Sequence, residues 1–183
     1  MSTKKEETRV RLLEAARKLL LERGFHGVGL EDIAAAAGVS RQAVYKSHFA
    51  SKAELLLELV RYVDVAENIP ELTRPVREAQ TGLQMLHETI RASVRIEVRV
   101  HELALLLSTA AGTDAGAAAA CRDRMEVKRG AYRAALLRLD AEGRFSSAWK
   151  VEEAVDWLAT LLSVDTYHPV SYTHLTLPTI LRV

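Results

Sequence analysis

The amino-acid sequence predicts an all-α protein, and three observations support this fold class. Apolar residues recur through most of the chain at the three- to four-residue spacing of a helical face. The 183 residues include only four prolines and nine glycines, which leaves room for long uninterrupted helices. No stretch with the alternating pattern of a β-strand competes with these helices. We therefore expect helices throughout and no sheet.

Helix signals can be followed along the chain in order. A first helix is expected over 7–23, where the Arg23-Gly24 pair stops it. Ser51 and Glu54 form a capping box that begins a later helix. The further amphipathic helices are expected at 52–63, 83–94, 114–142 and 151–162, with an apolar segment at 100–111.

Residues 24–55 are the most informative stretch, because they combine helix, tight turn and helix. Ile33 lies on the first helix, and Gly38 can adopt the positive φ that ends it. Ser40 is a favoured N-cap for the second helix, which opens with Arg41. A helix-turn-helix of this kind docks in the major groove of DNA. The alternative is a structural helical hairpin, since alanine-rich helices separated by glycine are common packing units.

The cations of this stretch are the candidates for contact with DNA. No carboxylate occurs between positions 41 and 52, although the net charge of the whole chain is only +1. Such a basic strip suits modest phosphate contact with groove readout, and the alternative is a solvated helix face. Two lysines near the N-terminus are expected on a flexible arm, which either reaches a phosphate or the minor groove or serves only solubility. The candidate DNA-binding residues are Lys4, Lys5, Ser40, Arg41, Gln42, Tyr45, Lys46, His48 and Lys52.

This stretch resembles the DNA-binding domain of the TetR (tetracycline-repressor) family of bacterial regulators. The resemblance is carried by Gly24-Phe25, Ile33-Ala34, Ala37-Gly38-Val39-Ser40, Val44-Tyr45, His48-Phe49, Ser51-Lys52 and Leu55. It implies a transcriptional regulator, by family default a repressor, that a small-molecule effector releases from a palindromic operator in double-stranded DNA. It also implies a homodimer whose two recognition helices lie about one DNA turn apart, roughly 34–36 Å.

Two features depart from the family pattern. The family usually has a threonine pair before the first helix of the motif, where this chain has Val28 and Gly29. The family also usually has two residues between the tyrosine and the phenylalanine, whereas three separate Tyr45 from Phe49 here. One extra residue rotates all later positions of the helix by about 100°, although residues at i and i+4 still share a face. Which of the three intervening residues faces the phosphates is left open.

The sequence divides into four expected parts. A helix-turn-helix DNA-binding domain occupies 1–65, and a linker with two prolines comes next at 66–75. The resemblance makes 76–168 a helical regulatory domain for effector binding and dimerisation. The threonine-rich tail at 169–183 is either foreign, such as a cloning scar or frame read-through, or a genuine disordered or strand-like end.

The resemblance further implies an effector pocket among the helices of the regulatory domain. The candidates are adaptable or polar side chains on otherwise apolar stretches, namely Met85, His101, Met125, Tyr132 and Trp157. The alternative for each is an ordinary core position. Cys121 is the only cysteine, which excludes an intrachain disulfide and a cysteine-based zinc cluster.

Other classes of function lack a sequence signal. No catalytic, phosphate-binding or metal-binding motif of known spacing occurs, so we expect no enzyme activity, no cofactor and no metal. No apolar run approaches the roughly 20 residues that span a bilayer, and we expect a cytoplasmic protein with no membrane partner. The competing hypothesis is a helical protein- or ligand-binding module without specific DNA binding. Salt dependence separates the two, because phosphate contacts weaken steeply with salt.

Overall fold

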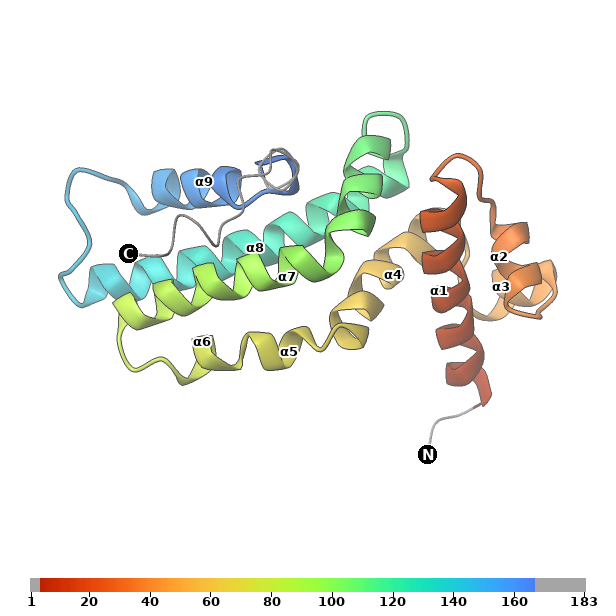
Figure 1. Ribbon diagram of the computed structural model, residues 1–183, viewed down its shortest axis with the longest axis horizontal. Coiled ribbons are helices and arrows are strands. Elements are labelled where there is room, and N and C mark those ends of the chain that lie inside the picture. Colours follow the sequence, from red (N-terminus) through yellow and green to blue (C-terminus); the bar gives the residue numbers. More distant parts are fainter. Residues whose placement is uncertain (1–3, 167–183) are drawn as a thin grey trace, which may run out of the picture. The chain divides into compact units, whose positions relative to one another are not determined.

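A computed structural model describes residues 4–166, and every regular element in that range is a helix (Figure 1). This confirms the predicted all-α class. The helices are α1 (Lys4–Arg23), α2 (Leu30–Ala36), α3 (Arg41–Ser47), α4 (Lys52–Ala66), α5 (Ile69–Leu72), α6 (Arg74–Glu78), α7 (Gly82–Ala110), α8 (Ala115–Ala141) and α9 (Val151–Leu161). The predicted tail at 169–183 lies outside the described residues, as do the side chains of Lys46 and Ser47.

Contacts divide the described chain into two compact units. Unit 1 comprises 4–68 and 102–124, and unit 2 comprises 69–101 and 125–166. The chain passes from one unit to the other within α7 and again within α8. This division differs from the expected one, because the end of α7 and the start of α8 group with the helix-turn-helix.

Leucines on α1 and α4 form the centre of unit 1. Leu12, Leu13 and Leu20 on α1 are fully buried, as are three leucines on α4, and the two helices pack together. All of these positions lie on the stripes that the periodicity predicts. However, α1 begins at Lys4 rather than at residue 7. Lys4 and Lys5 therefore lie in the first helical turn, where both are exposed, and not on a flexible arm.

The start of α8 lies unusually close to the start of α4. A Cβ atom added at Gly116 would lie 2.8 Å from the Cα atom and 2.9 Å from the Cβ atom of Ala53. Real Cβ atoms are essentially never found that close to another atom. Only glycine at position 116 therefore permits this approach of the two backbones.

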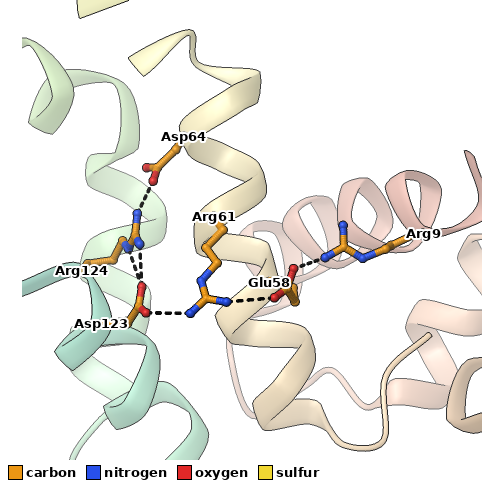
Figure 2. Close-up of polar contacts among 6 residues, drawn as sticks. All are labelled: Arg9, Glu58, Arg61, Asp64, Asp123 and Arg124. Atoms are coloured by element: carbon orange, nitrogen blue, oxygen red, sulfur yellow. Dashed lines mark hydrogen bonds and ion pairs between the residues drawn. The ribbon is translucent and has the colours of Figure 1, made fainter. Parts of the chain in front are cut away.

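A chain of alternating charges links α1, α4 and α8 (Figure 2). Arg61 on α4 donates to Asp123 on α8 at 3.0 Å and to Glu58 at 3.1 Å. Glu58 also accepts from Arg9 on α1. The remaining links join Arg124 to Asp123, at 2.6 Å, and Arg124 to Asp64. Hydrogen bonds from Arg124 and Arg61 lower the pKa of Asp123, which keeps that carboxylate charged within the network.

The expected linker contains two short helices, α5 and α6. Pro70 and Pro75 each occupy the second residue of their helix. The amide of a residue in the first turn has no partner within its helix, so proline is tolerated there. The two prolines thus mark helix starts, whereas the sequence pattern suggested an irregular segment.

Unit 2 is built on the continuous helices α7 and α8, with α9 packed on them. No glycine or proline occurs between 83 and 110, so the expected helix and the apolar segment after it form one helix of 29 residues. The start of α7 is anchored to the end of α8, because the amide of Gly82 donates to both carboxylate oxygens of Glu142 at 2.8 and 2.9 Å. The core consists of Tyr132, Leu136, Val155 and Ala159.

Within residues 4–166, none of the helices has the length and apolar character required to cross a membrane.

Candidate nucleic-acid interface

The first helix of the motif, α2, begins without a hydroxyl cap. Gly29 occupies the N-cap position, and its amide donates to the carboxylate of Asp32 at 2.8 Å. Glu31 and Asp32 also place negative charge at the positive end of the helix. Asp32 thus supplies the side-chain acceptor that bonds the N-cap amide, in a motif that lacks the threonine pair usual in the family.

The turn between α2 and α3 has the geometry that the sequence predicts. Gly38 has a φ of +68°, and the amide of Val39 donates to the carbonyl of Ala34 at 3.0 Å, which closes the helix end. Ser40 then caps α3, because its hydroxyl accepts from the amide of Ala43 at 3.2 Å. These bonds fix the direction in which α3 leaves the turn.

One face of α3 is exposed and the opposite face is fixed in the core. Val44 is completely buried, whereas Arg41, Gln42 and Tyr45 are exposed. The guanidinium of Arg41 lies 5.7 Å from the centre of the Tyr45 ring and 2.5 Å from a carboxylate oxygen of Glu31. DNA would have to replace the Glu31 contact in order to recruit this guanidinium.

The extra residue after Tyr45 is absorbed in the backbone at the end of α3. The carbonyl of Val44 accepts from the amide of His48 at 3.0 Å and from the amide of Phe49 at 2.9 Å. The second bond spans five residues instead of the four of an α-helix, so the last turn is wider by one residue. Phe49 consequently still reaches the core, with only 1% of its surface exposed.

His48 lies at this wider turn and is half-buried. Its Nδ1 atom makes no hydrogen bond with any part of the chain that the structure describes. Burial lowers the pKa of His48, and the positive charges of Lys5 and Arg9 lower it further. The cationic side chains of Lys5 and Arg9 at the start of α1 therefore lie close enough to His48, at the end of α3, to affect its charge.

Lys52 has a structural role that its position in the sequence did not reveal. Its Nζ atom donates to the carbonyl oxygens of Phe25 at 3.0 Å and of Val28 at 2.8 Å, and lies 4.0 Å from the centre of the Phe25 ring. Burial lowers the pKa of this lysine, while Asp114 acts in the opposite direction. The ammonium group thus holds the loop before α2, and its contact with DNA stays a prediction.

The nine candidate DNA-binding residues therefore divide into distinct groups. Ser40, Arg41, Gln42 and Tyr45 lie exposed at the start of α3 and along it. Lys4 and Lys5 are exposed on the first turn of α1, His48 is half-buried and Lys52 is turned inward; the side chain of Lys46 lies outside the described part. No local pattern indicates that Glu31 pairs with Arg41, because ten residues separate the two.

The five effector candidates have different environments in unit 2. Tyr132 is completely buried and donates to Ser93 at 3.1 Å, and Met125 packs against the same core cluster. Met85 and His101 are half-buried. Trp157 is 56% exposed and its ring lies edge-on to that of Trp149, at 6.3 Å between ring centres.

Comparison with known proteins identifies the helix-turn-helix. Residues 12–59 match the family model described as "Bacterial regulatory proteins, tetR family". The chain is 37% identical over 91 residues to the HTH-type transcriptional activator FasR of Mycolicibacterium smegmatis, which covers 49% of this chain and 38% of FasR. It is 47% identical over 55 residues to the HTH-type transcriptional regulator TtgR of Pseudomonas putida, which covers 30% of this chain and 26% of TtgR. The chain thus matches less than half the length of either relative.

Comparison with solved structures shows a similar fold over most of the chain. The transcriptional regulator FadR of Bacillus subtilis, solved with stearoyl-CoA, superposes with a TM-score of 0.71 at 17% identity, over 90% of this chain and 89% of FadR. At this identity the likeness establishes the fold alone.

Proposed function

We propose that this chain, which matches the tetR family model over residues 12–59, is a transcriptional regulator that binds operator DNA through α3. The observation that carries the proposal is the exposed row Arg41, Gln42 and Tyr45 on a helix capped by Ser40. Arginine and glutamine can make paired hydrogen bonds to base edges in the major groove. The buried Val44 on the opposite face keeps this row in a fixed orientation.

We further propose a homodimer that recognises an inverted repeat and acts as a cytoplasmic repressor. Several large apolar side chains on the helices of unit 2 are more than half exposed, namely Val98, Val127, Leu137, Trp157 and Leu161. If these side chains form one contiguous patch, that patch would favour burial against another chain. A two-fold dimer would present two copies of α3 to a palindromic site.

Release by a small molecule is the remaining part of the proposal. The solved relative FadR contains stearoyl-CoA, and another solved relative, from Saccharomonospora viridis, contains choline. We propose that a small-molecule effector binds unit 2 of this chain. It would weaken DNA binding only if it binds more tightly to the DNA-free conformation.

The test is selection from a pool of random double-stranded DNA, followed by anisotropy titration of the recovered sites at two salt concentrations. We expect an inverted repeat whose affinity falls steeply with salt. Arg41→Ala should weaken binding and relax the preference at one position in each half-site. Lys18→Ala, which removes an exposed α1 cation outside the proposed interface, is the matched control and should leave the sequence preference unchanged.

Glu31→Gln is a second test of the same interface, and here the change should strengthen DNA binding instead of weakening it. Removing this carboxylate frees the guanidinium of Arg41, so operator affinity should rise. Weak, salt-insensitive and sequence-independent binding by the unmodified chain would instead favour a helical module without specific DNA binding.

A further inference from the structure

A stripe of polar residues runs along α7 inside unit 2. Thr89, Ser93, Glu97 and His101 follow one another at four-residue intervals, so they share one face of the helix. The first three are at least nine-tenths buried. A stripe of this kind on a helix that packs in a core lowers stability unless each polar group has a partner.

The two hydroxyl groups of the stripe are satisfied locally. Thr89 donates to the carbonyl of Met85 at 2.7 Å, and Ser93 donates to the carbonyl of Thr89 at 2.9 Å. Ser93 also accepts from the hydroxyl of Tyr132 on α8. Both hydroxyl groups therefore form hydrogen bonds within the protein and do not require a ligand.

Glu97 differs, because only one of its oxygens is satisfied. Its Oε2 atom accepts from the Nζ atom of Lys128 at 2.8 Å. Its Oε1 atom is buried and makes no hydrogen bond to any described residue. The Nδ1 atom of His101 lies 3.9 Å from it, a distance that allows an ion pair but not a hydrogen bond. The carboxylate thus keeps a buried acceptor oxygen available.

The pair formed by Glu97 and Lys128 is hard to explain by stability alone. Apolar residues of similar size often replace a buried ion pair without loss of stability. A buried charged oxygen without a hydrogen bond further lowers the stability of the folded chain, and a bound group that donates a hydrogen bond would remove this cost. The neighbouring core supplies apolar surface, with Leu86 and Met125 packed against the Tyr132 cluster.

We propose that Glu97 Oε1 binds the head group of the effector, and that this effector is a small, mainly apolar molecule with an N–H or O–H donor. The inference rests on the proposed regulatory function and specifies the chemistry of its ligand. Met125 and Tyr132 were effector candidates from the sequence, and Glu97 adds the polar contact that selects the head group. Carboxylate-headed molecules are excluded by charge repulsion.

The first experiment measures the binding of four probes, each with eight carbon atoms, to the full chain. The probes are octan-1-ol, octylamine, octanoate and heptyl methyl ether. Both tryptophans lie in unit 2, so intrinsic fluorescence and thermal melting report binding there. A donor-headed probe should bind at least about tenfold more tightly than the ether, as expected for one hydrogen bond to a charged group. Octanoate should bind no better than the ether. The alcohol and the amine then distinguish a neutral donor from a cationic one.

The variants separate recognition from folding. The double change Glu97→Leu with Lys128→Met removes both charges together, so the protein should still fold. It should lose the roughly tenfold preference for the donor probe and keep its affinity for the ether. Glu126→Leu, which removes an exposed carboxylate from α8, is the control and should keep the preference. The single change Glu97→Gln retains an acceptor oxygen and should keep part of the preference.

The proposal is overturned if no probe binds, if the ether or octanoate binds as tightly as the donor probes, or if the double variant keeps the preference. Operator titration without probe tests the regulatory function separately. If the unmodified chain binds operator DNA but shows no donor preference, only the Glu97 site is overturned. A donor preference in a chain that binds no operator overturns the proposed regulatory function.

Discussion

Replacement of Gly116 by alanine tests the close contact between α8 and α4. A new Cβ atom would lie 2.8 Å from the Cα atom of Ala53, whereas carbon atoms pack best at about 3.5–4.0 Å. The two backbones would therefore have to separate by about 0.7–1.2 Å at this point. Overpacking of this kind costs about 1–3 kcal/mol in the free energy of unfolding.

Gly130, also on α8, provides the matched control. A Cβ atom at this position meets nothing within 4 Å, and the residue is exposed. Alanine there should stabilise the helix by up to about 1 kcal/mol, because glycine has poor helix propensity. Position 116 lies in the first turn of α8, where the propensity gain is smaller than in the helix interior. The difference between the two variants therefore combines this smaller gain with the cost of the contact with Ala53.

Thermal unfolding followed by circular dichroism measures this difference. For a chain of this size, 1 kcal/mol corresponds to a change in Tm of about 2–4 °C. We expect Gly130→Ala to raise Tm and Gly116→Ala to melt about 2–12 °C below it. Equal increases in Tm for both variants would refute the close contact between α4 and α8.

Three other changes test the groups around the candidate interface. Lys52→Met should destabilise the protein by about 2–4 kcal/mol in urea unfolding, because two hydrogen bonds and a cation–π contact are lost; unchanged stability with weaker DNA binding would instead identify a phosphate contact. Burial lowers the pKa of His48, so just below pH 6.5 the unfolded chain binds more protons than the folded chain. The free energy of unfolding should therefore fall as the pH drops through this range. His48→Gln should flatten that dependence in urea titrations between about pH 5.5 and pH 7.5. A double-mutant cycle with Arg61→Ala and Asp123→Ala should give a coupling of about 0.5–1 kcal/mol, and additive effects would contradict their ion pair.

Local sequence chemistry predicted much of the fold. Gly38, Ser40 and Ser51 have the turn and cap roles expected of them, because a positive φ and a side-chain cap depend on residues only a few positions apart. The buried stripes of α1 and α4 follow from the period of the helix. The same local reasoning misplaced the start of α1, since Lys4 to Glu6 carry no apolar residue to mark a helical face.

Partners far apart in the sequence could not be predicted in this way. Lys52 is charged and follows an N-cap serine, which favours a solvent-facing interpretation. Its ammonium instead bonds carbonyls 24 and 27 residues earlier, at a place fixed by the packing of α4. Glu97 likewise resembles the many exposed glutamates of the other helices. Its burial depends on the position of Lys128, 31 residues away. Residue type and local pattern do not encode these long-range pairings.

The extra residue before Phe49 illustrates how backbone hydrogen bonding can preserve a core while changing a surface. Within an α-helix the Val44 carbonyl would pair with the amide four residues on. Here this carbonyl accepts from two successive amides, so the widened turn returns Phe49 to the core position. The exposed row Arg41, Gln42 and Tyr45 precedes the additional residue in the sequence. The added length therefore falls on the segment around His48, where the electrostatic environment is set by Lys5 and Arg9 of α1.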